Sequence, residues 1–433
     1  MMKPSTNLAE AADADATDPR DLPTLDRARP IPRISIQAFC EEQASVEAMQ
    51  AATQDRRLAK SHVSVHMGGA HAAVRHYIDS PTPNLIVIET SLGREQLLSE
   101  LDRLAECCDA GTKVIIVGRT NDVSLYRELL RRGVSDYLIS PIDQFQFLDS
   151  LSNIYNNPET DPVGNVIAFI GAKGGVGSST ICHNVAWAMS QTAQSNVIVA
   201  DLDLPFGTTG LDFNQDPVQG IADALLNPDR LDEVLLDRLL TKCSEQLSIF
   251  AAPVVLDRDF DITAEACNTV IEVIRQHVPY VVLDLPHQWN DWVRNVLFHA
   301  DEIVITAIPD LANLRNAKNL VDMLKAKRPN DAPPKLVLNM AKMPKRPEIA
   351  AKEFATALGI QPLQIIEFDS EAFGQSANNG QMIEEHSPKA KSAPQFRELA
   401  NAVAHRREIK AEQKKPSSSS ALAPLLEKFK IKL

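Results

Sequence analysis

The sequence has few cysteines and none of the cysteine spacings that hold a metal ion. Its six cysteines form no C-x-x-C pair, and none lies at zinc spacing from a histidine, so we expect scattered, reduced thiols and no zinc site. No apolar run reaches the roughly 18 residues that a membrane-spanning helix needs. The start of the chain also lacks an apolar signal core. These absences predict a protein that is made and kept in the cytoplasm.

Basic residues are also scarce. The 433 residues contain 44 lysines and arginines against 57 aspartates and glutamates, which gives a net charge of −13. This balance disfavours a general attraction to nucleic acid or to an anionic membrane surface. A hydrophobic content of 44% is ordinary for a globular protein, and the length is sufficient for two domains.

The first part of the chain predicts a disordered tail and then a small α/β domain. Residues 1–30 are rich in Ala, Asp, Pro and Thr and show no apolar periodicity. Over residues 31–155, short apolar segments alternate with helical patterns, which predicts a doubly wound parallel sheet. This order, with Pro141 after the fifth strand, resembles the flavodoxin-like receiver domain of response regulators. The expected strands are 34–39, 62–66, 85–88, 113–117 and 136–139.

The residues that carry phosphotransfer in receiver domains are missing here. Glu89 stands at the phosphoacceptor position after the third strand, and the hydroxyl and lysine positions hold Gly118 and Ser140. Receiver phosphorylation needs a carboxylate nucleophile, Mg²⁺ ligands and a lysine together. We therefore expect a degenerate receiver-like domain that serves contacts. The alternative is that Glu89 supplies a fixed negative charge.

A polar segment at 156–164 predicts the linker to a second domain over 165–407. This second domain opens with an apolar strand at 166–170, a glycine-rich loop at 174–177 and a helix from Ser178. A strand, a glycine loop and a helix in this order bind phosphate. The glycines let backbone N–H groups turn inward, and the helix N-terminus adds positive potential. The pattern predicts a P-loop NTPase domain with a parallel sheet.

Polar residues that a P-loop NTPase uses follow in the required order. Ser179 offers a hydroxyl to Mg²⁺, and Asp284, at the end of an apolar strand, is placed like the Walker B carboxylate that holds a metal-bound water. Asp201 and Asp203 end the strand expected beside the loop, where a carboxylate orients the attacking water; Asp201 is a further candidate metal ligand. An aspartate at a strand end is usually only a turn or cap residue. Several such features in the right order favour the functional interpretation.

The second domain resembles the ParA/MinD family in its deviant Walker A motif, which reads A-K-G-G-V-G-S-S-T with the lysine at Lys173. The resemblance extends to the D-L-D at 201–203, the D-L-P at 284–286 and the L-V-L-N that ends at Asn339. A degenerate receiver-like domain before such a domain resembles the CpaE and TadZ proteins, which are assembly and localisation factors of Flp/Tad-type pili. The resemblance implies ATP and Mg²⁺ as cofactors.

The resemblance also implies a role for each matching residue. Lys173 is the signature lysine, which in the family reaches across a two-fold homodimer to the partner's phosphates, and Asp203 positions water; these two are the catalytic candidates. Ser179 binds Mg²⁺ and Asn339 contacts adenine. The nucleotide-binding loop comprises Lys173, Gly174, Gly175, Val176, Gly177, Ser178, Ser179 and Thr180.

Ser178 departs from the usual P-loop, which has a lysine at this position. A charge-assisted contact to phosphate contributes roughly 1.5–3 kcal/mol, so its loss lowers nucleotide affinity by about one to two decades. Lost transition-state stabilisation lowers the hydrolysis rate by a further ~10²–10³. His287 also stands where a glycine usually follows the D-x-P segment. We expect ATP to hold an assembly together with weak or no hydrolysis, and the sequence leaves open whether the chain is an enzyme.

Residues 408–433 predict a flexible tail that ends in a short amphipathic segment at 421–433. Such a segment docks into a partner groove or makes a peripheral membrane contact. The resemblance implies a homodimer with Tad/Flp secretion components as partners: the secretion ATPase, the inner-membrane platform or a pole-recruiting factor. It implies a location in the cytoplasm, at the inner membrane or at the cell pole.

Two alternative functions stay open. One is a slowly cycling ParA/MinD-type ATPase that positions cargo. The other is a DNA-bound partitioning protein, supported by basic clusters at 325–328 and 342–346. Clusters of this kind are more often solvated helix faces, and the net charge of −13 disfavours nucleic acid as a partner.

Overall fold

The computed structural model describes residue 31 and residues 34–404, with gaps at 60, 79, 110, 156–163, 194 and 254–259. The predicted tails at 1–30 and 408–433 therefore lie outside the described residues, and so does nearly all of the predicted linker. Within the described ranges, no helix combines the length and the apolarity that crossing a bilayer requires.

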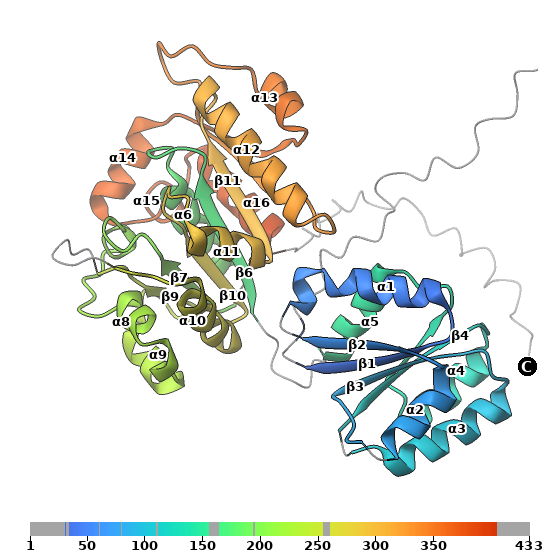
Figure 1. Ribbon diagram of the computed structural model, residues 1–433. Helices are drawn as coiled ribbons and strands as arrows, with labels where there is room; N and C mark the ends of the chain where they lie inside the picture. The colour runs from blue at the N-terminus through green and yellow to red at the C-terminus, as the bar shows by residue number, and fades with distance from the viewer. Residues whose placement is uncertain are drawn as a thin grey trace, which may run out of the picture.

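The first domain is an α/β unit with a five-stranded sheet. Its strands lie in the order β2-β1-β3-β4-β5, and each neighbouring pair is parallel, which is the flavodoxin-like order. Helices α1 and α5 pack on one face of the sheet, and α2, α3 and α4 pack on the other (Figure 1). All five predicted strands are present, with small shifts at their ends. The elements are β1 (Ser35–Cys40), α1 (Gln43–Thr53), the 3₁₀ turn η2 (Arg56–Leu58), β2 (His62–Met67), α2 (Gly69–Tyr77), β3 (Leu85–Thr90), α3 (Arg94–Cys107), β4 (Lys113–Gly118), α4 (Val123–Arg131), β5 (Asp136–Ile139) and α5 (Gln144–Tyr155).

The second domain is a larger parallel α/β unit. Its eight strands lie in the order β13-β12-β11-β6-β10-β7-β9-β8, and only the β8–β9 pair at one edge is antiparallel. Its strands are β6 (Asn165–Gly171), β7 (Val197–Asp201), β8 (Thr241–Lys242), β9 (Leu247–Phe250), β10 (Tyr280–Asp284), β11 (Glu302–Ala307), β12 (Lys335–Ala341) and β13 (Pro362–Glu367). Its helices are α6 (Ser178–Ala193), α7 (Thr209–Asp212), α8 (Ile221–Leu226), η3 (Pro228–Arg230), α9 (Glu233–Leu239), α10 (Ala264–His277), α11 (Asp291–His299), α12 (Leu311–Lys327), α13 (Ala351–Leu358), α14 (Ser370–Asn379), α15 (Ile383–His386) and α16 (Ser392–Val403).

Strand β6 shows why the central strands read as unbroken apolar runs. Val166, Ala168 and Ile170 face one layer of helices, which includes α10, α11 and α12, whereas Ile167 and Phe169 face α6 and α16. Both faces of the sheet are covered, so both sets of alternating side chains are buried. Because the strands are parallel, the segments after β6, β7, β10 and β11 all emerge at one edge. We call this the carboxyl edge, and the opposite one the amino edge.

Candidate nucleotide site

The loop between β6 and α6 has the backbone that its glycines predict. Gly175 and Gly177 have φ angles of +77° and +82°, a region that residues with a side chain rarely adopt. Lys173, Gly174 and Gly175 are exposed, and Ser179 and Thr180 are partly exposed in the first turn of α6. The predicted phosphate loop is thus open to a ligand on its outer side.

Two side chains from other elements hold the start of this loop. The Nδ1 atom of His287, which follows β10, lies 3.0 Å from the carbonyl oxygen of Gly171. The side-chain amide of Asn316, on α12, donates to the carbonyl of Ala172 at 2.9 Å. The histidine that replaces a family glycine therefore ties the segment after β10 to the loop.

Asn339 holds the other end of the loop. Its Nδ2 donates to the carbonyl of Val176 at 2.8 Å, and its side chain is almost fully buried. A Cβ on Gly177 would lie 2.6 Å from the same nitrogen, so glycine is required here for space as well as for its backbone angles. The contact of Asn339 with adenine stays a prediction.

Several polar atoms at the carboxyl edge are buried without a partner in the described part of the chain, and three of them belong to predicted site residues. Among the described residues, no hydrogen bond reaches Ser178 Oγ, Asp203 Oδ1 or Asp284 Oδ1. These residues follow β6 and β7 or end β10, so they come together beside the loop. Buried polar atoms in proteins are nearly always hydrogen-bonded. A hydroxyl and two carboxylate oxygens left in this way fit a phosphate with Mg²⁺ and its waters.

A buried histidine, His183, links Asp284 to Asp212, and the sequence did not predict it. His183 on α6 is fully buried; its Nδ1 lies 2.7 Å from Asp212, and its Nε2 lies 3.0 Å from the Thr209 hydroxyl and 3.4 Å from Asp284. Burial lowers the pKa of His183, but hydrogen bonds with Asp212 and Asp284 outweigh it and raise the value to about 10. The only signal in the sequence was a histidine within the apolar run of α6.

The three aspartates differ in how much of each is available to a ligand. Both oxygens of Asp201 accept hydrogen bonds, from the backbone of Asp203 at 3.1 Å and from the Thr209 hydroxyl at 2.7 Å. Burial and the charge of Asp284 raise the pKa of Asp201 to about 7. Burial also raises the pKa of Asp203. Asp203 and Asp284, each with an oxygen to spare, are better placed than Asp201 to meet water or metal.

In the first domain, the residue at the phosphoacceptor position is used internally. The Glu89 carboxylate is 3% exposed. It accepts the backbone N–H groups of Glu41 and Glu42 at 2.8 and 2.9 Å, and the Ser45 hydroxyl at 2.7 Å. The carboxylate thus fastens the end of β3 to the start of α1, where N–H groups have no helical partner. The Glu89 carboxylate therefore faces the interior of the first domain.

Half of the six cations in the two basic clusters are engaged in ion pairs. Lys342 pairs with Glu367, and Arg346 pairs with Glu348 and also donates to a backbone carbonyl. Arg328 pairs with Asp331 and is buried in the interdomain contact described below. Three of the cations that suggested DNA binding are therefore used within the protein.

Comparisons with known proteins agree with this geometry. A family model described as an AAA domain matches residues 164–332. The structure of a ParA family ATPase from Chlorobium tepidum is 28% identical, and the match covers 55% of this chain and 98% of that one, with a TM-score of 0.51. The second domain belongs to the ParA/MinD superfamily of P-loop proteins. In this ParA/MinD-like domain, Lys173 and Ser178 occupy the two positions at which a P-loop lysine is found.

Two other relatives match smaller parts. The septum site-determining protein MinD of Synechocystis is 26% identical over 165 residues, which are 38% of this chain and 60% of that protein. The pilus assembly protein CpaE from Caulobacter crescentus is 46% identical over 29% of this chain and 97% of the solved chain, with a TM-score of 0.29. The chain thus spans less than two thirds of the Synechocystis MinD.

Proposed function

We propose that this chain is a cytoplasmic ATP-binding assembly factor of the CpaE/TadZ type for a Flp/Tad pilus machine. Bound MgATP holds it as a homodimer, and hydrolysis is weak or absent. The observation that carries the nucleotide part is that buried oxygens of Ser178, Asp203 and Asp284, beside the glycine loop, have no hydrogen-bond partner within the described ranges. The pilus part rests on the loop sequence and on a degenerate receiver-like domain ahead of it.

Each residue of the site has a defined task in this proposal. The backbone N–H groups of the loop and the N-terminus of α6 bind the phosphates. Ser179 and Asp284 would hold Mg²⁺, which would supply positive charge to offset that of the phosphates. Ser178 offers a hydroxyl where a lysine would place a charge, so the site binds the nucleotide and accelerates its hydrolysis little. Lys173 supplies the missing cation to the nucleotide of the other subunit.

The surface around the loop supports a second copy as the occupant. Lys173 is exposed, and the large apolar side chains of Phe206, Trp289 and Leu311 are 69%, 50% and 73% exposed. These residues follow β6, β7, β10 and β11, so they share the carboxyl edge. Exposed apolar groups that surround a charged site are typical of an interaction surface.

Gel filtration of the full chain tests the nucleotide-held dimer. Wild type is expected to elute as a dimer with MgATP and as a monomer without nucleotide or when Mg²⁺ is chelated. Lys173→Ala is expected to stay monomeric, because it removes the cation that crosses the interface. Lys352→Ala, which removes an exposed lysine of α13, is the matched control. If every sample elutes at the same volume with and without MgATP, and no ATP binding is measured, the ATP-dependent dimer is overturned.

A slowly cycling ATPase is the second candidate. The observation in its favour is Asp203, whose pKa is raised by burial and whose Oδ1 has no partner in the described part of the chain. Such a carboxylate is suited to orient or deprotonate a water. Measured turnover that depends on Asp203 would favour cycling over a purely structural role for ATP.

A further inference from the structure

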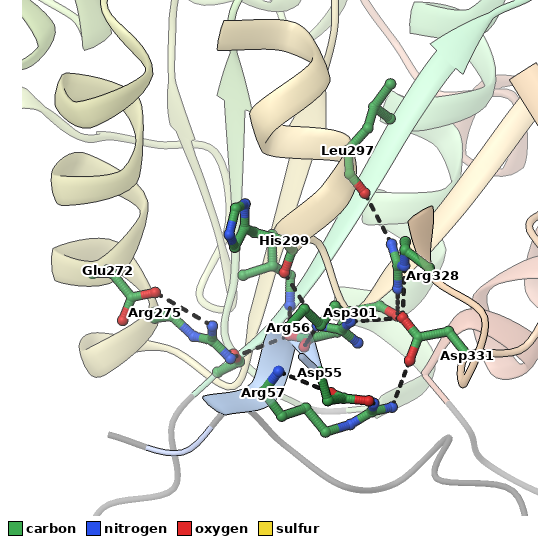
Figure 2. Close-up of polar contacts among 12 residues, drawn as sticks. Asp55, Arg56, Arg57, Glu272, Arg275, Leu297, His299, Asp301, Arg328 and Asp331 are labelled. Carbon is green, nitrogen blue, oxygen red and sulfur yellow. Dashed lines mark hydrogen bonds and ion pairs between the residues drawn. The ribbon is translucent and has the colours of Figure 1, made fainter. Parts of the chain in front are cut away.

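The turn after α1 reaches into the second domain. Its two arginines both bond Asp331, which lies between α12 and β12: Arg56 Nε lies 2.6 Å from one carboxylate oxygen and Arg57 Nη2 lies 2.7 Å from the other. Arg328 Nε lies 2.6 Å from the same carboxylate. One aspartate thus receives three guanidinium groups, two of them from the first domain (Figure 2).

A second set of contacts surrounds this one. Arg56 donates to the carbonyl oxygen of His299 at 3.3 Å and lies 3.4 Å from Asp301. Asn330 donates to Asp55 at 3.0 Å, so the contact also runs from the second domain back to the turn. We call Arg56, Arg57, Asp301, Arg328 and Asp331 the interdomain arginine cluster.

The cluster lies at the amino edge of the large sheet. Asp301 directly precedes β11, and Asp331 lies in the segment that leads to β12, whereas the nucleotide loop follows β6 at the opposite edge. In the first domain, the turn precedes β2 and so lies at the amino edge of the smaller sheet. The amino edge of the large sheet is therefore joined to the first domain through this turn and through Gln144, at the start of α5, which donates to Asn330 at 3.4 Å.

The charges of this contact are shielded from water. The side chains of Arg57, Asp331 and Arg328 are 2%, 6% and 6% exposed. Although burial opposes the charged form of Asp331, the arginines lower its pKa to about 2. Removing one partner from such a group leaves an uncompensated buried charge, and salt screens buried pairs far less than surface ones.

We propose that Asp301, Arg328 and Asp331 of the second domain form a docking surface whose occupant is the Arg56–Arg57 turn of the same chain. It holds the first domain in one fixed orientation at the end of the ParA/MinD-like domain farthest from the nucleotide. A protein that binds to the first domain would then lie away from the carboxyl edge, where the proposed function places the second copy of the chain. This inference does not depend on whether the chain binds ATP.

Amide hydrogen exchange and small-angle scattering of the full chain test the docking. In Asp331→Asn, the amide would present N–H donors to guanidinium donors, so exchange over 55–59 and 297–301 is expected to accelerate by about tenfold or more, and the radius of gyration to rise. Asp322→Asn, on the exposed face of α12, is the matched control. Wild type is expected to keep its dimensions between about 0.1 and about 0.5 M salt.

Arg57→Gln decides the outcome if Asp331→Asn fails to fold. It changes only the first domain, so faster exchange at 297–301 in the second domain reports loss of docking and not a local defect. Exchange and dimensions equal to wild type in a folded Asp331→Asn or Arg57→Gln protein would overturn the proposal. If these variants bind ATP as wild type does, their loss of docking does not arise from a defect in the nucleotide site.

Discussion

At the carboxyl edge of the large sheet, Ser178, Asp203 and Asp284 each bury an oxygen that has no partner among the described residues. At the amino edge, both carboxylate oxygens of Asp301 and of Asp331 bond arginines. An unpaired buried polar group costs about 1–3 kcal/mol of folding free energy. The carboxyl edge therefore keeps groups that serve a ligand at the expense of stability, whereas the amino edge uses its charges to join two domains.

Asp203→Ala is expected to have the largest effect. It tests whether the carboxyl edge serves a ligand more than it serves the stability of the fold. If Asp203 orients the attacking water, whatever ATP turnover wild type shows is expected to fall by ~10²–10⁴. Folding stability is expected to stay the same or to rise by at most about 1–3 kcal/mol, because the variant removes a buried oxygen that has no partner among the described residues. Phosphate release and urea denaturation measure the two quantities.

The comparison variant for Asp203→Ala is Asp301→Ala at the amino edge. It is expected to leave nucleotide binding unchanged and to lower stability by about 1.5–3 kcal/mol, because Arg56 and Arg275 each lose one of two carboxylate partners and keep Asp331 and Glu272, respectively. If Asp203→Ala retained full turnover, the slow-cycling candidate would be removed. If it destabilised the protein as much as Asp301→Ala does, the contrast between the edges would be wrong.

Ser178→Lys sharpens the comparison by adding charge where the site lacks it. A lysine at this position restores the usual contact to phosphate, so ATP affinity is expected to rise by about ten- to a hundredfold, equivalent to roughly 1.5–3 kcal/mol. Titration calorimetry on the full chain measures the change. Ser178→Met, a side chain of similar length without charge, is the matched control.

An equal affinity in Ser178→Lys and Ser178→Met would contradict the electrostatic account of this loop. It would mean that the backbone N–H groups and Mg²⁺ already supply the whole of the phosphate interaction. In that case the replacement of lysine by Ser178 would be neutral for binding, and weak hydrolysis would need another cause, such as the attachment of His287 to Gly171.

The same contrast shows what the sequence could predict. The strands of both sheets and the glycine loop were predictable, because buried parallel strands are continuous apolar runs and the loop needs glycine at fixed positions. Ser178, Asp203 and Asp284 were also found, since the ends of parallel strands share an edge. Strands β8, β9 and β13 were missed. β8 and β13 lie at the edges of the sheet, bury little and carry mixed side chains, and β9 has only four residues.

The contacts made by charged side chains could not be predicted in the same way. Arg57 and Asp331 are separated by 274 residues, and neither lies in a motif, so only the packed fold brings them together. Arg328 even suggested a DNA-binding surface, although it is buried against Asp331. His183 was missed because a histidine on an apolar helix gives no sign of the two aspartates, Asp212 and Asp284, that flank it.

Per pH unit, the change of stability with pH is the smallest effect that we expect. The stability that His183 contributes at the carboxyl edge is lost as pH rises, whereas the stability that Asp331 contributes at the amino edge is lost as pH falls. Hydrogen bonds with Asp212 and Asp284, opposed by burial, raise the pKa of His183 from 6.5 to about 10. The stabilisation from its protonated ring is therefore complete below pH 6.5 and is lost as pH rises through about 10. The pKa of Asp331 is lowered from 3.8 to about 2, so its contribution is complete above pH 3.8 and is lost as pH falls through about 2.

Denaturation of wild type is therefore expected to show a loss of stability on both the acid and the alkaline side. The raised pKa of Asp201, about 7, contributes to the alkaline fall up to about pH 7, and the raised pKa of His183 continues it to about pH 10. Each group contributes a slope of at most about 1.4 kcal/mol per pH unit. His183→Gln is expected to flatten the alkaline fall and to leave the acid fall intact, because only the carboxyl edge has changed. Equal alkaline slopes in wild type and His183→Gln would show that His183 is not a folded-state cation. The carboxyl edge would then hold its aspartates together without an internal positive charge.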